Sequence, residues 1–118
     1  MPAALADFFT IVERDHTRTR SVARLASAAG ISTRRLGELL EAQGKPSAKQ
    51  VICERVVLEQ KRRLAHSDIS IKELATLTGF DEPTNMVKFF RHFTGTTPTA
   101  FRALHRADRR FLPFRRGS

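Results

Sequence analysis

The stretch that decides the fold runs from Ile69 to Phe101 and reads ISIKELATLTGFDEPTNMVKFFRHFTGTTPTAF. Apolar residues recur at helical spacing before Gly79 and again after Pro83. Glycine adopts a positive φ without a Cβ clash, so Gly79 suits a sharp turn between two helices. The stretch therefore predicts a helix-turn-helix. Its inward faces would be Ile71, Leu74, Ala75 and Thr78 in the first helix and Met86, Phe89, Phe90 and Phe93 in the second.

An earlier stretch, from Ser21 to Leu40, repeats this pattern and reads SVARLASAAGISTRRLGELL. A glycine-containing break follows each copy, at residues 44–47 and 95–99. One match to L-A-x-x-x-G could be coincidence, but two copies in register favour a divergent internal duplication. The positions that align at an offset of 49 residues are Leu25 with Leu74, Ala26 with Ala75 and Gly30 with Gly79.

Helices account for nearly all the order that the sequence predicts, because no alternating β-branched run is long enough to be a strand. The segment 48–65 contains neither glycine nor proline, so it can form a stiff rod. We expect an all-α fold with two helix-turn-helix subdomains joined by this long central helix. The predicted parts are a first lobe at 3–46, a linker helix at 47–66, a second lobe at 67–107 and a basic tail at 108–118. The seven predicted helices are 3–13, 21–29, 33–43, 48–65, 71–78, 83–93 and 99–105.

The chain resembles the DNA-binding region of the AraC/XylS family of bacterial transcription regulators. Nearly the whole chain takes part, and the most specific segments are Asp68–Ala75, Gly79–Pro83 and Phe89–Pro98. The chain departs from the family pattern at Pro46-Ser47, where similar chains more often read Ser-Pro. The resemblance implies double-stranded DNA as a partner, recruitment of RNA polymerase as the output, and no cofactor.

Composition agrees with a nucleic-acid partner. The net charge is +9, from 21 Lys and Arg against 12 Asp and Glu, and the pI is near 11.2, so a polyanion is the expected ligand. No apolar run could span a bilayer and no signal peptide begins the chain, which predicts a cytoplasmic protein. Dispersed histidines and the absence of a phosphate-binding loop argue against an enzyme, a metal site or a small-molecule site. Cys53 is expected to be a structural or merely tolerated thiol in the connecting helix.

The second helix of a helix-turn-helix enters the major groove with residues near its N-terminal end. In the first copy Arg34 is the best base reader, since its guanidinium matches the O6/N7 edge of guanine. The resemblance places base contacts at Arg34, Gly37 and Glu38. Gly37 has no side chain, and Glu38 can accept only from a base amino group such as cytosine N4. Two interpretations stay open: this helix reads bases, or it binds mainly backbone through Arg35.

In the second copy Thr84, Asn85 and Lys88 project opposite the apolar face. Asn85 can pair with adenine, and Lys88 with guanine or phosphate. The resemblance places base contacts at the same three positions. Thr99 could contact a phosphate or be a helix N-cap, and the two roles are compatible. The predicted phosphate contacts are Thr33, Arg35, Arg91, Thr97, Thr99 and Arg102.

Two recognition helices on one rod could read successive major-groove segments about 34 Å apart, so one molecule would bind an asymmetric site. Activation of transcription is the outcome that the family resemblance implies. If the rod holds the two recognition helices closer than this, the DNA bends or one helix disengages.

Gly37 and Glu38 motivate an alternative function, that of a protein-interaction adaptor or antagonist that keeps the fold. A nonspecific basic nucleic-acid binder is the third hypothesis for the function.

The phenylalanines at helical spacing are expected in the core rather than stacked on bases. Phe111 and Phe114 could fold back on the lobe or bind a partner.

Overall fold

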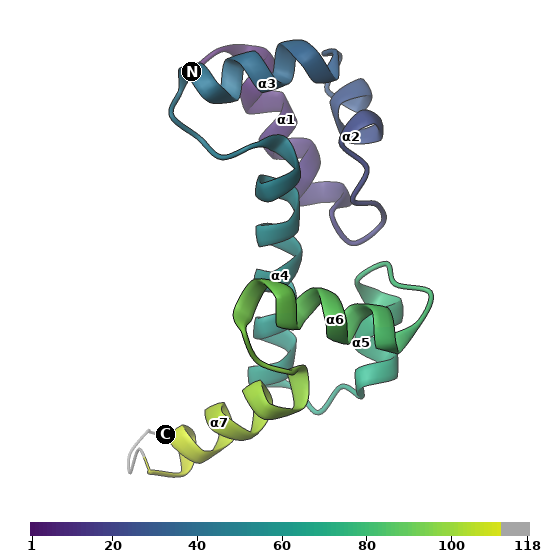
Figure 1. Ribbon diagram of the computed structural model, residues 1–118, viewed down its shortest axis with the longest axis vertical. Coiled ribbons are helices and arrows are strands. Elements are labelled where there is room, and N and C mark those ends of the chain that lie inside the picture. Colours follow the sequence, from purple (N-terminus) through teal and green to yellow (C-terminus); the bar gives the residue numbers. More distant parts are fainter. Residues whose placement is uncertain (112–118) are drawn as a thin grey trace.

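The structure is a computed structural model that describes residues 1–111, with side chains described for residues 1–106. Seven helices and no strand make up the described chain, which confirms the all-α prediction (Figure 1). The molecule is elongated, with principal extents of 48 × 32 × 22 Å. The helices are α1 (Ala3–Asp15), α2 (Val22–Ala28), α3 (Thr33–Ala42), α4 (Ala48–His66), α5 (Ile71–Leu77), α6 (Pro83–Thr94) and α7 (Pro98–Phe111).

Two hydrophobic clusters divide the molecule into two lobes. We call α1 to α3 with the N-terminal part of α4 the first lobe, and α5 to α7 with the rest of α4 the second lobe. The predicted inward faces are confirmed, because their residues are buried or packed against these clusters. The buried residues are Leu5, Phe8, Val12, Leu25, Ala26, Leu36, Leu40, Ala48 and Ile52 in the first cluster and Val56, Val57, Leu64, Leu74, Ala75, Phe80, Met86 and Phe90 in the second.

The long helix α4 connects the lobes. Its 19 residues correspond to a rod of roughly 28 Å at 1.5 Å per residue. Ile52 belongs to the first cluster and Val56, one turn later, to the second. Cys53 lies between them, only 2% exposed, and burial raises the pKa of its thiol. A buried thiol of this kind is inert, which fits a structural role.

Arg55 ties the middle of α4 to α1. Its Nε donates to Glu13 Oε2 at 2.6 Å, and its Nη1 lies 3.5 Å from Glu59 Oε1. The hydrogen bond from Arg55 lowers the pKa of Glu13, and a hydrogen bond from Arg63 lowers the pKa of Glu59, with Arg55 adding its charge. These carboxylates are therefore held in the ionised form by neighbouring guanidinium groups.

Helix boundaries follow local chemistry. Gly30 and Gly79 adopt φ values of +75° and +85° in the two equivalent turns, as the sequence predicts. Serine side chains accept a backbone N–H at the start of four helices, which satisfies one of the donors that a helix N-terminus leaves unpaired. Ser70 and Glu73 make a reciprocal capping box at α5. The four capping serines are Ser21, Ser32, Ser47 and Ser70.

The last helix differs from its predicted range in two ways. The Ala100 N–H donates to Thr97 Oγ1 at 3.1 Å, so Thr97 rather than Thr99 caps α7, and Pro98 takes the first helical position, which suits its fixed φ. The helix then continues to Phe111 instead of ending at residue 105, since no glycine or proline interrupts residues 99–112. The side chain of Phe111 and all of Phe114 lie outside the described residues.

Candidate nucleic-acid interface

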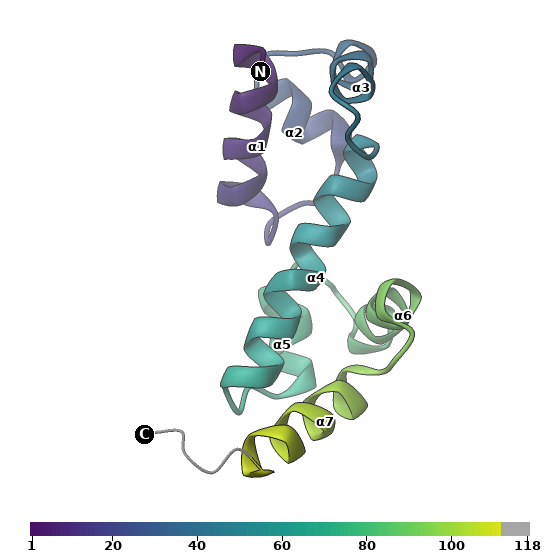
Figure 2. The same ribbon diagram turned by 90° about the vertical axis from the view of Figure 1, so that its left-hand side faces the viewer.

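Helices α3 and α6 lie on the same side of the molecule. Figure 2 shows both nearly end-on at one side of α4, with α1 at the other. Each recognition helix is held there by buried residues on its inner face, Leu36 and Leu40 in α3 and Met86 and Phe90 in α6. Their outer edges are thereby left free to meet one continuous surface.

The predicted residues of α3 all lie on its exposed edge, and Glu38 joins two of them. Arg34 Nε lies 3.5 Å and Arg35 Nη1 3.3 Å from the Glu38 carboxylate. The Arg34 side chain is 91% exposed, and ion pairs this exposed are worth little. Both arginines can therefore leave Glu38 for a stronger anion. Thr33 and Gly37 are also exposed.

The predicted residues of α6 are exposed and unengaged. Thr84, Asn85 and Lys88 lie on the outer edge, and within residues 1–106 their side chains make no hydrogen bond or ion pair. Pro83 opens the helix at its first position, as the sequence predicts. Arg91, one turn beyond Lys88, is exposed as well. This edge thus presents an amide, a hydroxyl and two cations to whatever approaches it.

The structure places the remaining phosphate candidates at α7. Thr97 and Thr99 lie at its start, where Thr99 is exposed and Thr97 is the cap. Arg102 is engaged within the protein. Its Nε donates to Leu64 O at 3.1 Å and its Nη2 to Ile69 O at 2.6 Å. The guanidinium donates to carbonyl groups around the C-terminus of α4, which gives it a structural role. Its contact with phosphate stays a prediction.

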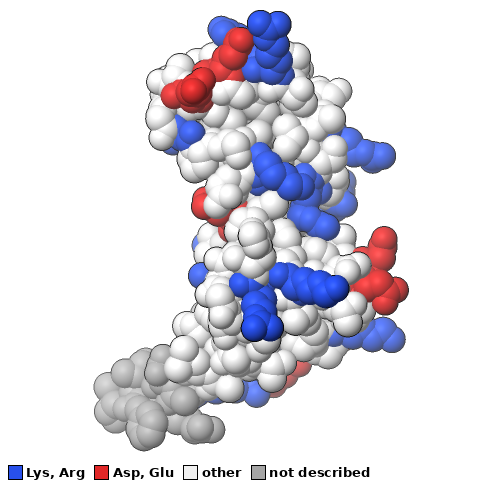
Figure 3. Space-filling model, in the orientation of Figure 1, with Lys and Arg blue, Asp and Glu red and all other residues white. Residues whose placement is uncertain are grey.

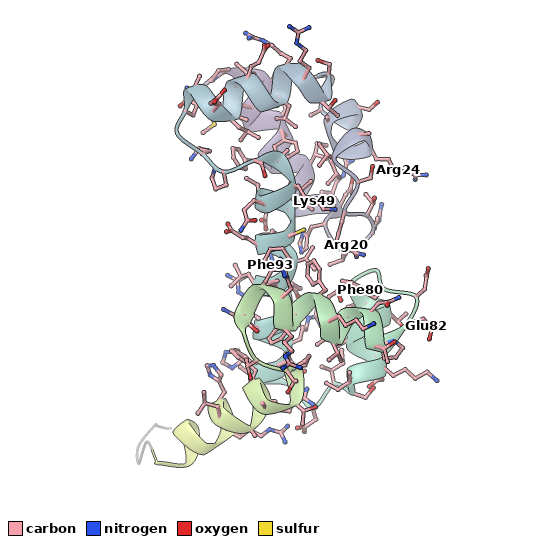
Figure 4. All side chains as sticks on the ribbon, viewed as in Figure 1. Arg20, Arg24, Lys49, Phe80, Glu82 and Phe93 are labelled. Atoms are coloured by element: carbon pink, nitrogen blue, oxygen red, sulfur yellow. The ribbon has the colours of Figure 1, made fainter. Side chains whose placement is uncertain are left out.

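Two cations missing from the predicted contacts lie on the same face. Lys49 is exposed in the first turn of α4, the position that Thr99 occupies in α7. Arg24 is exposed in the first turn of α2. Figure 4 shows Lys49 and Arg24 between the levels of α3 and α6, and Figure 3 shows basic side chains spread over this face. The internal duplication did not point to Lys49, because its offset of 49 residues aligns Lys49 with Pro98. Lys49 and Thr99 share a position only by the observed starts of α4 and α7.

Comparison with known proteins agrees with this geometry. Residues 25–104 match the family model described as a helix-turn-helix domain. The DNA-binding domain of AdpA, a global transcriptional factor, is 30% identical, with a TM-score of 0.79 over 93% of this chain and 99% of that one. The chain belongs to the AraC-type helix-turn-helix family. The AdpA domain was crystallised in complex with a target DNA.

Two other members of the fold support the same architecture. A DNA-binding transcriptional dual regulator from Escherichia coli K-12 is 21% identical, with a TM-score of 0.75 over 91% of this chain and 96% of that one. An AraC-type regulator from Chromobacterium violaceum is 19% identical, with a TM-score of 0.69 over 92% and 96% of the two chains. No curated protein matches the sequence. The fold of this AraC-type domain is therefore that of DNA-binding transcription regulators.

No three His, Cys, Asp or Glu side chains of residues 1–106 gather where they could hold a metal ion. Among the described helices, none combines the length and apolar character that a membrane crossing requires.

Proposed function

We propose that this AraC-type domain binds double-stranded DNA sequence-specifically and regulates transcription, with α3 and α6 entering two successive major-groove segments. The observation that carries the proposal is that both helices lie on one side of α4 (Figure 2), each with exposed polar residues. The AdpA domain, similar over almost its whole length, binds a target DNA and supports this choice.

The proposed base readers lie near the N-termini of the two helices. On α6, Asn85 can accept from and donate to adenine, Lys88 can donate to guanine, and Thr84 can reach either base. On α3, Arg34 can bind guanine once it leaves Glu38, whose carboxylate can then accept from a cytosine amino group. Gly37 lacks a side chain, so it would allow close approach without reading a base.

The proposed phosphate contacts flank these readers. Thr33 and Arg35 lie beside Arg34 at the start of α3, and Arg91 follows Lys88 on α6. Thr97 and Thr99 add the N-terminus of α7, whose dipole favours an anion. Such contacts fix the register of the protein on the duplex without selecting a sequence.

Selection from a randomised duplex library at near-physiological salt tests the proposal. Two sequence blocks about one helical turn apart are expected if both helices read DNA. Asn85→Ala should then cost about 1–3 kcal/mol on the selected site and relax specificity within one block. Lys72→Ala, an exposed lysine on α5, is the matched control and should change nothing. Equal affinity for selected and scrambled duplexes would contradict sequence-specific binding.

One observation favours a second candidate, an adaptor or antagonist that keeps the fold. Glu38 places a carboxylate on the edge of α3 and engages both Arg34 and Arg35, which weakens the attraction of that helix for phosphate. An adaptor would lose no DNA affinity on substitution of Asn85 or Lys88. A selected motif with only one block would mean that α6 alone discriminates.

We also propose that the regulator activates transcription by contacting RNA polymerase, which the family resemblance supports. Transcription in vitro from a promoter that carries the selected site tests this output. Added protein should raise transcript yield from that promoter and leave a promoter with a scrambled site unchanged. A fall in yield at the selected site would identify a repressor.

A further inference from the structure

The loop between α1 and α2, residues 16–21, contacts the turn between α5 and α6. Arg20 makes the main side-chain contact between these two segments. Its Cζ lies 3.8 Å from the centroid of the Phe80 ring, and its Nη1 donates to Gly79 O at 3.3 Å. Figure 4 shows Arg20 of the first lobe directed toward Phe80 of the second. The two residues are far apart in sequence, so the contact joins the lobes directly.

The backbone of the two lobes approaches closely at the same place. A Cβ added to Gly79 would lie 2.9 Å from Thr17 O, whereas a Cβ added to Gly30, at the equivalent turn of the first motif, would meet nothing within 4 Å. Gly79 therefore serves the turn and also admits the loop of the other lobe. Gly30 serves its turn alone.

Arg20 differs from the solvated arginines around it. Its side chain is half-buried, and burial lowers the pKa of its guanidinium. No carboxylate forms an ion pair with it among the described residues, although the Asp81 charge acts on it from a distance. A guanidinium over an aromatic face is more strongly attracted when it is partly removed from water. The Phe80 ring is thus its main partner.

The contact leads on to the second recognition helix. The ring centroids of Phe80 and Phe89 are 5.1 Å apart, and Phe89 belongs to α6. Arg20 Cζ is also 5.5 Å from the Phe89 ring. Arg20, Phe80 and Phe89 therefore form a packed series from the first lobe to α6.

Without this series, α4 would be the main link between the lobes. Every helix pair with extensive contact between the lobes of the described chain includes α4. The two buried clusters have no described residue in common. A single rod fixes the separation of the two recognition helices but leaves their relative rotation about its axis weakly held. A second contact away from that axis removes the remaining freedom.

We propose that Arg20 is a positioning residue that fixes the angle between the two lobes and thereby the DNA spacing that one molecule accepts. The spacing part rests on the proposed function, whereas the angle is a property of the free protein. Each added base pair shifts a DNA block by about 3.4 Å and turns it by about 35°. A protein with fixed lobes therefore penalises a change of spacing.

The angle is tested without DNA by residual dipolar couplings in partly aligned solution. Couplings from helices of both lobes should fit one alignment tensor in the unmodified chain. Arg20→Gln should give the lobes separate tensors, and Arg20→Lys should restore part of the agreement. Phe80→Leu keeps an apolar side chain and removes the ring, so it serves if Arg20→Gln does not fold. Arg18→Lys, in the same loop but 80% exposed, is the control.

The spacing is tested on the selected duplex and on a duplex with one extra base pair between its blocks. Arg20→Gln should reduce the affinity ratio of the two duplexes by about fivefold or more, the factor that a partly desolvated cation–π contact represents. Arg18→Lys should leave that ratio unchanged. A single tensor in both Arg20→Gln and Phe80→Leu would overturn the role of Arg20 in fixing the angle between the lobes and leave the proposed function standing. Separate tensors with an unchanged ratio would overturn the role in spacing. If no sequence is selected, the proposed function fails, and the couplings still decide the role of Arg20 in the angle.

Discussion

Replacement of three glycines by alanine, one at a time, tests how this structure uses glycine. The same methyl group enters three different environments. Gly37 lies inside α3, and a Cβ there meets nothing within 4 Å. Gly30 has a φ of +75° with equally open space, whereas Gly79 combines a φ of +85° with the 2.9 Å approach of Thr17 O. The series therefore separates helix propensity, backbone strain and inter-lobe packing.

The magnitudes follow from these environments. Gly37→Ala should stabilise the fold by about 0.8–1.0 kcal/mol, the helix-propensity difference at an exposed interior site, and raise Tm by roughly 4 °C. Gly30→Ala should destabilise by about 1–2 kcal/mol, the cost of a left-handed backbone for a residue with a Cβ. Gly79→Ala adds overpacking against Thr17, about 1–3 kcal/mol more.

Urea unfolding followed by circular dichroism at 222 nm is the assay, since the chain contains no Trp or Tyr to report by fluorescence. Domains of this size are stable by about 5–15 kcal/mol, so each difference is measurable. The difference between Gly79→Ala and Gly30→Ala isolates the contact between the lobes, because the two positions are equivalent in the duplicated motif.

Two results would refute the reasoning. Equal losses for Gly79→Ala and Gly30→Ala would mean that the Thr17 carbonyl moves away at no cost, so the lobes are not tightly joined at this turn. A loss of stability for Gly37→Ala would mean that the site in α3 is not open to an added methyl group. Either outcome would be visible as a shift of the urea midpoint without a change of slope.

Three further predictions concern charged side chains. Lys49→Ala should weaken selected and random DNA alike and reduce the slope of log K against log salt by about 0.9, whereas Lys72→Ala should leave the slope unchanged in the same titration. Arg102→Met should lower the free energy of unfolding by about 1.5–3 kcal/mol, because carbonyl groups at the end of α4 lose a charged donor, while near-equal urea midpoints would contradict that role. Glutamates with a lowered pKa stabilise the fold above their ordinary pKa, and this contribution is lost as pH falls through the lower folded value. The stability of the unmodified chain should therefore decline as pH falls below the ordinary glutamate pKa of 4.5, and urea titrations of Arg55→Met should show a shallower decline.

The elements that the sequence predicted well are governed by neighbours along the chain. Gly30 and Gly79 turn where the glycine pattern placed them, and Pro83 opens α6. The exposed edge of α6, with Asn85 and Lys88, followed from the spacing of the buried face. The contacts of these residues with DNA stay predictions.

The features that sequence reasoning missed depend on contacts between distant residues. Arg102 was expected at a phosphate, yet it binds carbonyl groups more than thirty residues earlier in the chain. Arg20 was one arginine among many until the fold placed it over Phe80. Thr97 caps α7 in place of the predicted Thr99, because the helix begins one residue before its predicted start.

The sequence alone determined the helices, the two turns, the duplication and the family, because periodicity, glycine and proline act over a few residues. Only the tertiary structure decided which arginines are free to meet DNA and which ones hold the protein together. A guanidinium has the same charge and reach in both roles, so its neighbours in space, and not those in sequence, select between them. Arg34 and Arg102 are the clearest pair, the first on an exposed helix edge and the second bonded to partly buried carbonyl groups.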